Sequence, residues 1–335
     1  MQAFIKQHGC NRQHCRGFSM VELMVALLLT IMLLGGMSQI FLGIKKSFTL
    51  QDALARQQEN GRYVIETLGR DLRRAGYMGA LQEPAAIGGT ESGVPENGTC
   101  PDDDNSWGRM LDSRIYGLND THSGYDCVPA ANHLRGDILI MRYQAPWIVG
   151  GPGMPGFEDE RLYLRSSLNR ATLFRGKDAS DPANSLAGAR GRSSELVARA
   201  YYVGPSSSGH CDGVAVPALF RESLNDKGLP VAEEIAYGID NLQLRYGVDL
   251  DGDASVDRYL DAGDPDLDKA DDWGAVINAQ VWVLTRSECP ETGYDSRGKI
   301  YAMGDVDYEP ADTAKRGYRR QLYQTTVTLR NPKHL

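Results

Sequence analysis

A long apolar run near the N-terminus is the strongest hydrophobic signal in the chain. Leu23–Ile44 are 22 consecutive residues without a charged side chain. As an α-helix such a run is about 33 Å long, which is enough to cross a hydrocarbon core of about 30 Å. A single acid, Glu22, lies immediately before it. The pattern predicts a helix of membrane-spanning length.

The helical pattern continues beyond this run, but with apolar residues on one face only. The residues of that face recur at spacings of three, four or seven: Leu50, Leu54, Gly61, Val64, Ile65, Leu68, Leu72 and Ala75. Arg73 and Arg74 followed by Gly76 are typical of a helix C-terminus. We therefore expect one helix over about residues 18–76, whose second half packs on a globular domain.

Short segments with β-branched residues or alternating polarity follow the helix and predict strands. They are Asp137–Tyr143, Arg161–Leu164, Ala171–Arg175, Glu195–Val203, Ala218–Arg221, Asn241–Val248, Ala275–Arg286 and Tyr318–Arg330. Residues 79–135 are rich in turn formers, and Gly150–Gly156 and Pro205–Gly209 are expected to be exposed turns or loops. One long helix followed by many antiparallel strands predicts an α+β fold with one large β-rich domain.

The segment before the apolar run does not have the features of an ordinary secretory signal. Such a signal is removed together with its apolar region at a small-residue site behind it. Here the run passes directly into Lys45 and Lys46, whereas a short basic leader ends at Gly17. The expected processing point therefore lies between Gly17 and Phe18, and the apolar helix stays on the mature protein.

These features resemble type IV pilins and their relatives in type II secretion. The shared features are a basic leader, Gly17 at the cleavage point, Phe18 as the new N-terminus, Glu22 four residues later and the apolar helix. The resemblance implies that a prepilin peptidase cleaves after Gly17 and methylates the amine of Phe18. It also implies a pilin-like fold, with the long N-terminal helix packed on a C-terminal antiparallel sheet domain.

Glu22 has two interpretations. A carboxylate near the bilayer interior is costly and is usually kept for a partner. The resemblance implies that this partner is the N-terminal amine of a neighbouring subunit. Locally, Ser19 and Glu22 form an S-x-x-E pattern, which is a capping box at a helix start. The two roles are compatible, and we favour the inter-subunit role.

Charge excludes one class of function and suggests a location. Removing Lys6, Arg12 and Arg16 with the leader leaves 33 basic and 44 acidic residues, a net charge of −11. Nucleic-acid binding requires basic surfaces, so we expect none in the globular head. The basic leader favours a cytoplasmic N-terminus, which places the head in the periplasm of a protein that crosses the inner membrane once.

The cysteines agree with export. After loss of the leader, four remain, Cys100, Cys127, Cys211 and Cys289. An even number at wide spacing in an exported domain suggests two disulfides. Three pairings are open, and sequence proximity favours Cys100–Cys127 and Cys211–Cys289. The alternative is that these residues are buried free thiols.

An acidic loop is the one sequence feature with metal-site chemistry. Its acids alternate through a tight turn, as the oxygen ligands of a hard cation do. The proposed ligands are Asp249, Asp251, Asp253, the Ser255 carbonyl, and Asp257 directly or through water. The loop resembles the calcium loops of bacterial modules, so calcium is the expected ion. The alternative is a solvated acidic turn, because the loop departs from the calcium-loop pattern at two positions. Ala254 stands where a glycine is usual, and Leu260 stands where an EF-hand has its bidentate acid. Asp261, one position later, could substitute for that acid.

A second, weaker repeat of the acidic spacing is Asp264, Asp266, Asp268 and Asp272.

Both ends of the chain are similar to minor pilins of the PilW family. The similar stretches are Glu59–Tyr77, Tyr237–Asp253 with Trp273 and Leu284–Arg286 behind it, and Tyr318–Asn331. The implied domains are the leader (1–17), the transmembrane or filament-core helix (18–44), its amphipathic continuation (45–78) and the head (79–335).

The resemblance implies a minor pilin that primes pilus assembly and joins the complex at the pilus tip. Its implied partners are other minor pilins, the major pilin and a tip adhesin. Alternatives are a type II secretion pseudopilin and a calcium-dependent adhesin displayed on the pilus. An anchored enzyme has little support, because His122, His133, His210 and His334 lie in loop-like or terminal stretches without a nucleophile pattern.

Overall fold

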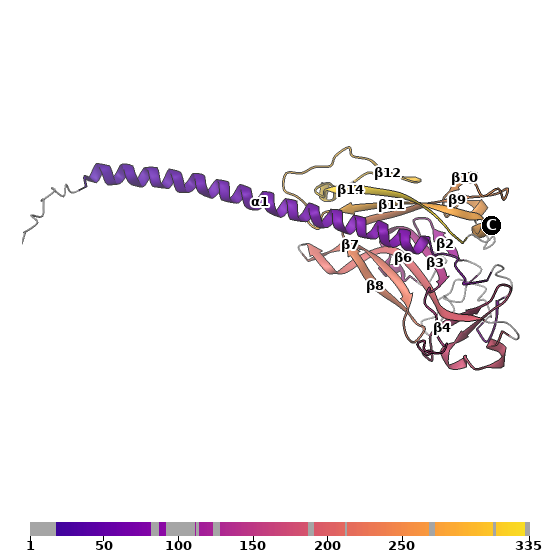
Figure 1. Cartoon of the computed structure of the whole chain (residues 1–335). Coiled ribbons are helices and arrows are strands. Elements are labelled where there is room, and N and C mark those ends of the chain that lie inside the picture. Colours follow the sequence, from indigo (N-terminus) through magenta and orange to yellow (C-terminus); the bar gives the residue numbers. More distant parts are fainter. Residues whose placement is uncertain are drawn as a thin grey trace, which may run out of the picture. The chain divides into compact units, whose positions relative to one another are not determined.

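The computed structural model describes residues 18–81, 87–91, 111, 114–122, 128–186, 191–211, 213–267, 272–310 and 313–331. The chain divides into two compact units, residues 1–52 and 53–335. Helix α1 (Met20–Leu72) runs without interruption through the boundary between them (Figure 1). The predicted helix is therefore confirmed, with ends that lie within a few residues of the expected ones.

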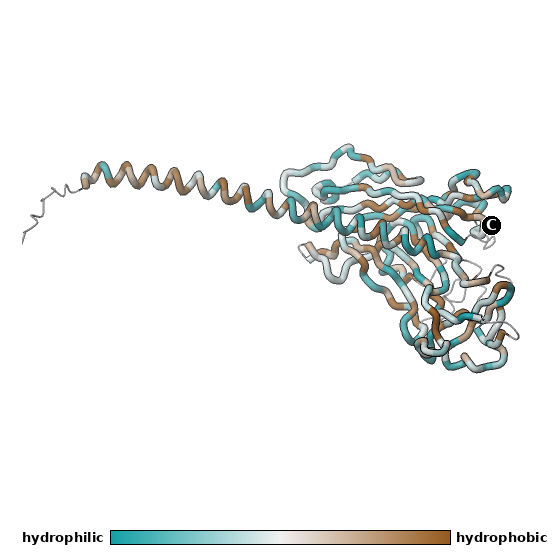
Figure 2. The backbone as a smooth tube through the Cα atoms, in the orientation of Figure 1, coloured by the Kyte–Doolittle hydropathy of each residue, from teal (hydrophilic) through white to brown (hydrophobic). Residues whose placement is uncertain are grey.

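The first unit contains the apolar half of α1. Every side chain from Phe18 to Thr49 is exposed, and Figure 2 shows this part of the helix as a nearly continuous hydrophobic stretch. Leucine and methionine dominate it, and these residues favour helix intrinsically. By length and composition α1 is able to cross a membrane.

The second unit contains an eight-stranded sheet with the path β1-β5-β4-β6-β3-β2, to which β7 adds on β6 and β8 adds on β7. The strands are β1 (Ile87–Gly88), β2 (Ile115–Leu118), β3 (Arg135–Gln144), β4 (Leu162–Ser166), β5 (Ala171–Arg175), β6 (Arg192–Cys211), β7 (Val214–Leu224) and β8 (Pro230–Tyr237). Its pairs are antiparallel, apart from the two-residue parallel pairing of β1 with β5.

A second, four-stranded sheet has the order β10-β9-β11-β14 and is antiparallel throughout. Its strands are β9 (Ile239–Val248), β10 (Arg258–Leu260), β11 (Val276–Arg286) and β14 (Arg320–Thr328). The remaining elements are the hairpin of β12 (Tyr301–Met303) and β13 (Val306–Tyr308), the short helix α3 (Thr313–Arg316), and 3-10 turns at Ala130–Asn132, Gly176–Asp178, Pro182–Asn184, Pro265–Leu267 and Asp272–Ala275.

One hydrophobic core joins the second half of α1 to both sheets. The helix contributes Val64, Leu68 and Leu72, and the turn after it contributes Ala75, all fully buried. The eight-stranded sheet adds residues such as Leu139, and the four-stranded sheet adds Val281, Val283 and Val327 among others. Figure 1 shows one sheet on each side of this part of α1. The apolar face predicted from the sequence is thus the face that the two sheets enclose.

A buried carboxylate fixes the last turn of α1 on the eight-stranded sheet. Asp71 is 1 % exposed. It accepts hydrogen bonds from the Tyr201 hydroxyl at 2.5 Å and the Tyr143 hydroxyl at 3.2 Å, and it forms an ion pair with Arg199. Burial and, second, the negative charge of Asp71 raise the pKa of Tyr143 to about 12, and the same two causes raise the pKa of Tyr201. Both tyrosines therefore remain hydroxyl donors at neutral pH.

One expected loop is a strand. Pro205–Gly209 was predicted as a turn, but it lies inside β6, which extends to Cys211. The Glu234 carboxylate of β8 accepts hydrogen bonds from the side chains of Ser206, Ser207 and Ser208, at distances of 2.5 to 3.0 Å. These bonds hold the serines in an irregular part of the strand. The eight predicted strands are confirmed, whereas the sequence pattern does not predict β1, β2, β8, β10, β12 and β13.

The opposite face of the eight-stranded sheet carries a buried acid with an unsatisfied oxygen. Glu222 lies on β7 between Phe220 and Leu224, which pack on a cluster that includes Ile140 and Tyr202. It is 6 % exposed, and its Oε2 atom has no hydrogen-bond partner within the described part of the chain. Burial raises the pKa of Glu222 to about 7.

We predict that Asp71→Ala lowers the free energy of unfolding of the head by about 3 kcal/mol, because Arg199 and two tyrosine hydroxyls lose a buried partner. Urea unfolding of the mature protein in mild detergent, followed by tryptophan fluorescence, measures the change. Glu66→Ala is the matched control on the same helix. Glu66 pairs with Arg70 at the exposed surface, so the expected change is below about 0.5 kcal/mol. Equal effects of the two substitutions would contradict the prediction.

We also predict a pH effect from Glu222. Because the folded state binds this proton more tightly than the unfolded state, ionisation costs stability as the pH rises from about 4.5 to about 7. In the wild type, this ionisation should lower the free energy of unfolding by about 3 kcal/mol between pH 5 and 8, and Glu222→Gln should remove this decrease. The measurement is urea unfolding at both pH values, with the exposed Glu59→Gln as control. An unchanged pH dependence in Glu222→Gln would rule out this assignment.

Candidate functional site

The N-terminal end of α1 presents the residues of the predicted processing and assembly site. Phe18 is 80 % exposed, and Glu22 is also exposed in the first turn of the helix. Gly17, the residue before the predicted cleavage point, lies outside the described residues. A peptidase that acts between residues 17 and 18 would therefore leave a mature chain that starts two residues before the helix.

Ser19 caps this helix. Its hydroxyl accepts a hydrogen bond from the backbone N–H of Val21 at 3.3 Å, and its carbonyl accepts one from Leu23. A capping box would place the hydroxyl bond on the N–H of Glu22 instead. The helix start is therefore satisfied by Ser19, and the exposed Glu22 carboxylate lies where a group from outside the chain can reach it.

The second half of α1 is held to the sheets near its beginning as well as at Asp71. Gln57 donates a hydrogen bond to the Thr285 hydroxyl at 2.9 Å, and Asn60 donates one to the Tyr237 carbonyl at 3.0 Å. Next to them the helix approaches β14 closely, because a Cβ atom on Gly61 would lie only 2.4 Å from the Tyr323 ring. A glycine at this position therefore sets the distance between helix and sheet.

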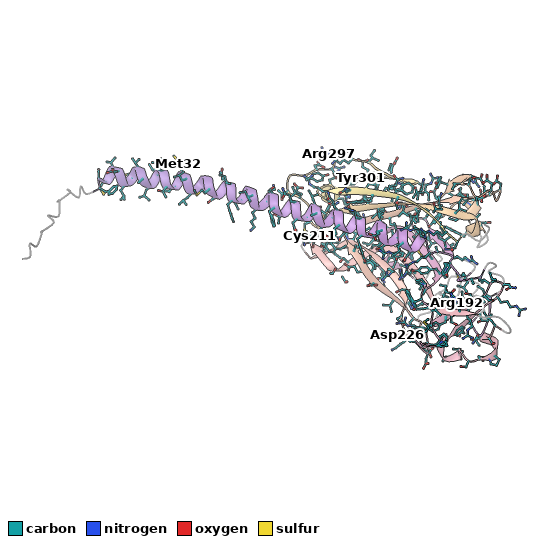
Figure 3. All side chains as sticks on the ribbon, viewed as in Figure 1. Met32, Arg192, Cys211, Asp226, Arg297 and Tyr301 are labelled. Carbon is teal, nitrogen blue, oxygen red and sulfur yellow. A yellow bond between two sulfur atoms is a disulfide. The ribbon has the colours of Figure 1, made fainter. Side chains whose placement is uncertain are left out.

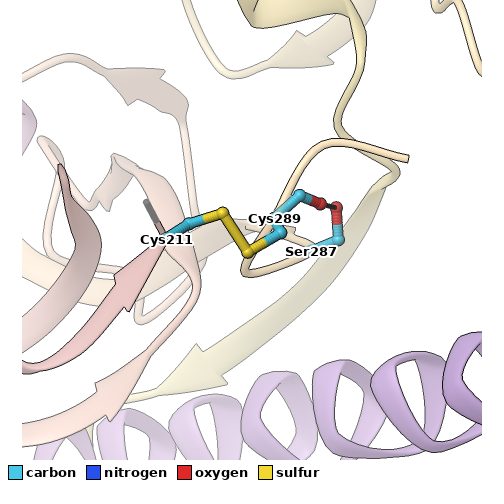
Figure 4. Close-up of a disulfide and its surroundings, with 3 residues drawn as sticks. All are labelled: Cys211, Ser287 and Cys289. Atoms are coloured by element: carbon cyan, nitrogen blue, oxygen red, sulfur yellow. Dashed lines mark hydrogen bonds between the residues drawn. A yellow bond between two sulfur atoms is a disulfide. The ribbon is translucent and has the colours of Figure 1, made fainter. Parts of the chain in front are cut away.

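One predicted disulfide is confirmed. Cys211 at the end of β6 and Cys289 beyond β11 are bonded (Figure 4), and they lie 78 residues apart in the sequence. The Ser287 hydroxyl donates to the Cys289 carbonyl at 2.9 Å and shapes the turn that carries this cysteine. The bond links the end of β6 covalently to the segment that follows β11. Cys100 and Cys127, the other predicted pair, lie outside the described residues.

The acidic loop connects β9 to β10. Carboxylate oxygens of Asp249, Asp251 and Asp257 lie within 4.8 Å of one another, which is close enough for one ion to contact all three. The loop also has internal bonds that shape it. Asp249 accepts from the backbone N–H groups of Gly252 and Ala254, and Asp257 accepts from that of Leu250.

The predicted ligand Asp253 is not part of this group. Asp253 accepts hydrogen bonds from the backbone N–H and the hydroxyl of Ser255, at 2.8 and 2.5 Å. Bonding to these two groups lowers the pKa of Asp253. Ala254 has a positive φ of 67°, which explains why a glycine is usual at this position. The structure thus brings together three of the predicted ligands, and Asp253 would have to turn to become a fourth.

The remaining acids of this region have other partners. Asp261, considered as a substitute ligand, accepts a hydrogen bond from Arg245 at 2.8 Å. Within the second acidic repeat, Asp266 pairs with Arg258, and Asp268 lies outside the described residues. The geometry therefore favours the first loop over the second as a cation site.

A buried ion pair in the head was not found from the sequence. Asp240 on β9 is fully buried and accepts hydrogen bonds from Arg320 at 2.7 Å, Arg135 at 3.1 Å and Tyr308 at 3.3 Å. These partners come from β14, β3 and β13. No local spacing connects residues so far apart in the chain, so only the fold reveals the cluster.

Comparisons with known proteins cover both ends of the chain. Residues 12–38 match the family model described as the prokaryotic N-terminal methylation motif. Residues 200–331 match the model described as type IV pilus-assembly protein W. No curated protein matches the chain. A type IV-like pilin from Thermus thermophilus is similar in structure, with 12 % identity, a TM-score of 0.34, and coverage of 85 % of this chain and 98 % of that one.

The two family matches confirm the resemblance inferred from the sequence. The first includes Gly17, Phe18 and Glu22, so the chain carries a prepilin-type leader and methylation motif. The second includes the stretches Tyr237–Asp253 and Tyr318–Asn331 and contains the whole four-stranded sheet together with the disulfide. The chain thus has an apolar N-terminal helix and a C-terminal region that matches the model of type IV pilus-assembly protein W, and this arrangement supports a minor pilin role.

Proposed function

We propose that this chain is a minor pilin that a prepilin peptidase processes and that then helps to prime type IV pilus assembly in a complex at the pilus tip. The N-terminal methylation motif followed by a fully exposed apolar helix half carries this proposal. Such a surface is stable in lipid or against other apolar helices, but not in water. The match to type IV pilus-assembly protein W favours this role over that of a type II secretion pseudopilin.

In this proposal the protein first crosses the inner membrane once, with its head in the periplasm. Its apolar helix later exchanges lipid for the helices of other minor pilins and the major pilin. The Glu22 carboxylate then pairs with the methylated amine of Phe18 on a neighbouring subunit. A charge pair surrounded by apolar side chains is strongly favoured over either charge alone, so it selects one axial register between subunits.

The test is to express the wild type and Glu22→Gln in a host that forms type IV pili and lacks its own copy of this protein. For the wild type we expect a mature N-terminus of N-methylated Phe18 by mass spectrometry, and recovery of the protein with sheared pili. Glu22→Gln keeps the size and hydrogen-bonding ability of the side chain but removes its charge. We expect it to be processed normally and to be recovered with pili at a level about tenfold lower or less.

Glu59→Gln, an exposed acid on the same helix, is the control and should behave as the wild type. Wild-type protein that keeps its first seventeen residues would disprove pilin-type processing. Normal recovery of Glu22→Gln with pili would instead disprove only the charge pairing.

We further propose that the β9–β10 loop binds calcium through Asp249, Asp251 and Asp257, with Asp253 and the Ser255 carbonyl completing the site after Asp253 turns. The support is the close approach of three carboxylates, because charges of the same sign are stabilised at that distance by a cation. A bound ion would fix this loop at the edge of the four-stranded sheet and offer a calcium-dependent surface for adhesion.

For calcium, we predict a saturable binding heat by titration calorimetry on the mature protein, together with a higher unfolding temperature. Asp251→Asn should weaken binding about tenfold or more, because it removes one ligand charge but keeps the hydrogen-bond acceptor that Asp253 uses. Asp181→Asn is the matched control, since the exposed Asp181 accepts the same kind of turn bond, from the backbone N–H of Ala183, and lies outside both acidic repeats. No binding heat and no thermal shift with the wild type would end the proposal.

A further inference from the structure

A cleft of about 280 Å³ opens in the head where β3 separates from β6. The two strands pair as far as Gln144 and Leu196, and they meet again in a bridge between Val149 and Ser193. Between these points the chain from Pro146 to Ile148 lines the cleft instead of pairing with β6. Tyr77, Gly79 and Ala80, from the segment that follows α1, also line the cleft. The opening is therefore a consequence of the strand path.

The floor of the cleft is rigid and its hydrogen bonds are satisfied internally. The Gln144 side-chain amide donates to the Leu164 carbonyl at 2.6 Å and accepts from the Ser166 hydroxyl at 3.2 Å. Gly79 covers this pair with a φ of +69°, and a Cβ atom there would lie 2.1 Å from the Gln144 amide oxygen. Only glycine allows the backbone to approach the floor so closely.

One wall carries two donors that have no partner. Ser194 is 4 % exposed, and its hydroxyl makes no hydrogen bond to any described residue. Arg192 (labelled in Figure 3) lies two residues earlier on the same face of β6 and is exposed. It forms no ion pair within the described part of the chain. By contrast, other arginines near these strands, such as Arg161 before β4 and Arg175 at the end of β5, are paired with glutamates.

The lining also has an apolar part. It consists of the half-exposed Tyr77 ring with Pro146 and Ile148. The neighbouring Trp147 is 54 % exposed and extends this apolar surface beyond the cleft. The lining thus combines a guanidinium group and a hydroxyl with aliphatic and aromatic groups.

We propose that this cleft binds the carboxyl terminus of a partner protein whose last residue is apolar. The terminal carboxylate accepts hydrogen bonds from Arg192 and Ser194, and the last side chain packs on Tyr77 and Ile148. Guanidinium groups prefer carboxylates because they can donate two parallel bonds. The proposal does not depend on the assembly role proposed above.

Size and connectivity favour a chain end over an internal acidic residue. The cleft is slightly smaller than typical sites for drug-sized ligands, which occupy about 300 to 1,000 Å³, so it holds about one residue. A terminal residue carries its carboxylate and its apolar side chain on the same Cα atom and needs only one exit for its backbone. An internal aspartate or glutamate needs two exits and brings no apolar group of its own.

The experiment uses the mature protein in mild detergent and a fluorescein-labelled hexapeptide of glycine and serine that ends in phenylalanine. Fluorescence anisotropy should show saturable binding of the form with a free carboxylate. The same peptide with an amidated end should bind at least about tenfold more weakly, because the charge-assisted bonds are lost. Arg192→Gln should weaken binding of the free acid by a similar factor, and Ser194→Ala by a smaller one.

Arg170→Gln is the matched control, since Arg170 is exposed on the β4–β5 turn away from the cleft. It should leave the affinity unchanged, and unfolding curves should show that all variants are folded. Three results would overturn the proposal: no saturable binding of the free acid, equal binding of acid and amide, or wild-type affinity in Arg192→Gln. Binding of 3-phenylpropanoate as tightly as the peptide would assign the cleft to a small acid instead of a chain end.

Discussion

The burial of one carboxylate, that of Asp71, determines how the helix and the eight-stranded sheet fit together. An unpaired charge in this position would be strongly unfavourable, so the helix must bring Asp71 to Arg199, Tyr143 and Tyr201 at the same time. This requirement fixes both the rotation of α1 and its position along its axis. The apolar contacts of Val64 and Leu68 then fall between the two sheets.

The two halves of α1 satisfy opposite requirements with one continuous hydrogen-bonded backbone. In the first half the apolar side chains are exposed and no charged residue occurs between Leu23 and Ile44. In the second half, one face is apolar and buried, whereas acids and bases occupy the other. A helix satisfies its own backbone in either environment, so the side chains alone decide which half suits lipid and which suits a protein core.

The sequence was sufficient for the features that depend on local patterns. The long helix, eight strands, the Cys211–Cys289 bond and the methylation motif could all be predicted from periodicity, spacing or short motifs. Features that depend on distant residues could not. Pro205–Gly209 has the composition of a turn, yet it lies inside β6, where Glu234 binds its serines. β8 has one buried residue and no apolar alternation.

The same distinction applies to the candidate sites. The spacing of the acidic loop correctly placed Asp249, Asp251 and Asp257 together, but it did not anticipate that Asp253 would bond to Ser255. The cleft that Arg192 and Ser194 line has no sequence motif, because its lining residues come from the segment after α1 and from the ends of β3, β4 and β6.

The position of the disulfide also orders events during synthesis. Because 78 residues separate Cys211 from Cys289, the bond can form only after β7 to β11 have been made. Until then the sheet built from the middle of the chain must hold its shape through packing alone. The covalent link is therefore a late step, which locks an arrangement that the nascent polypeptide has already reached.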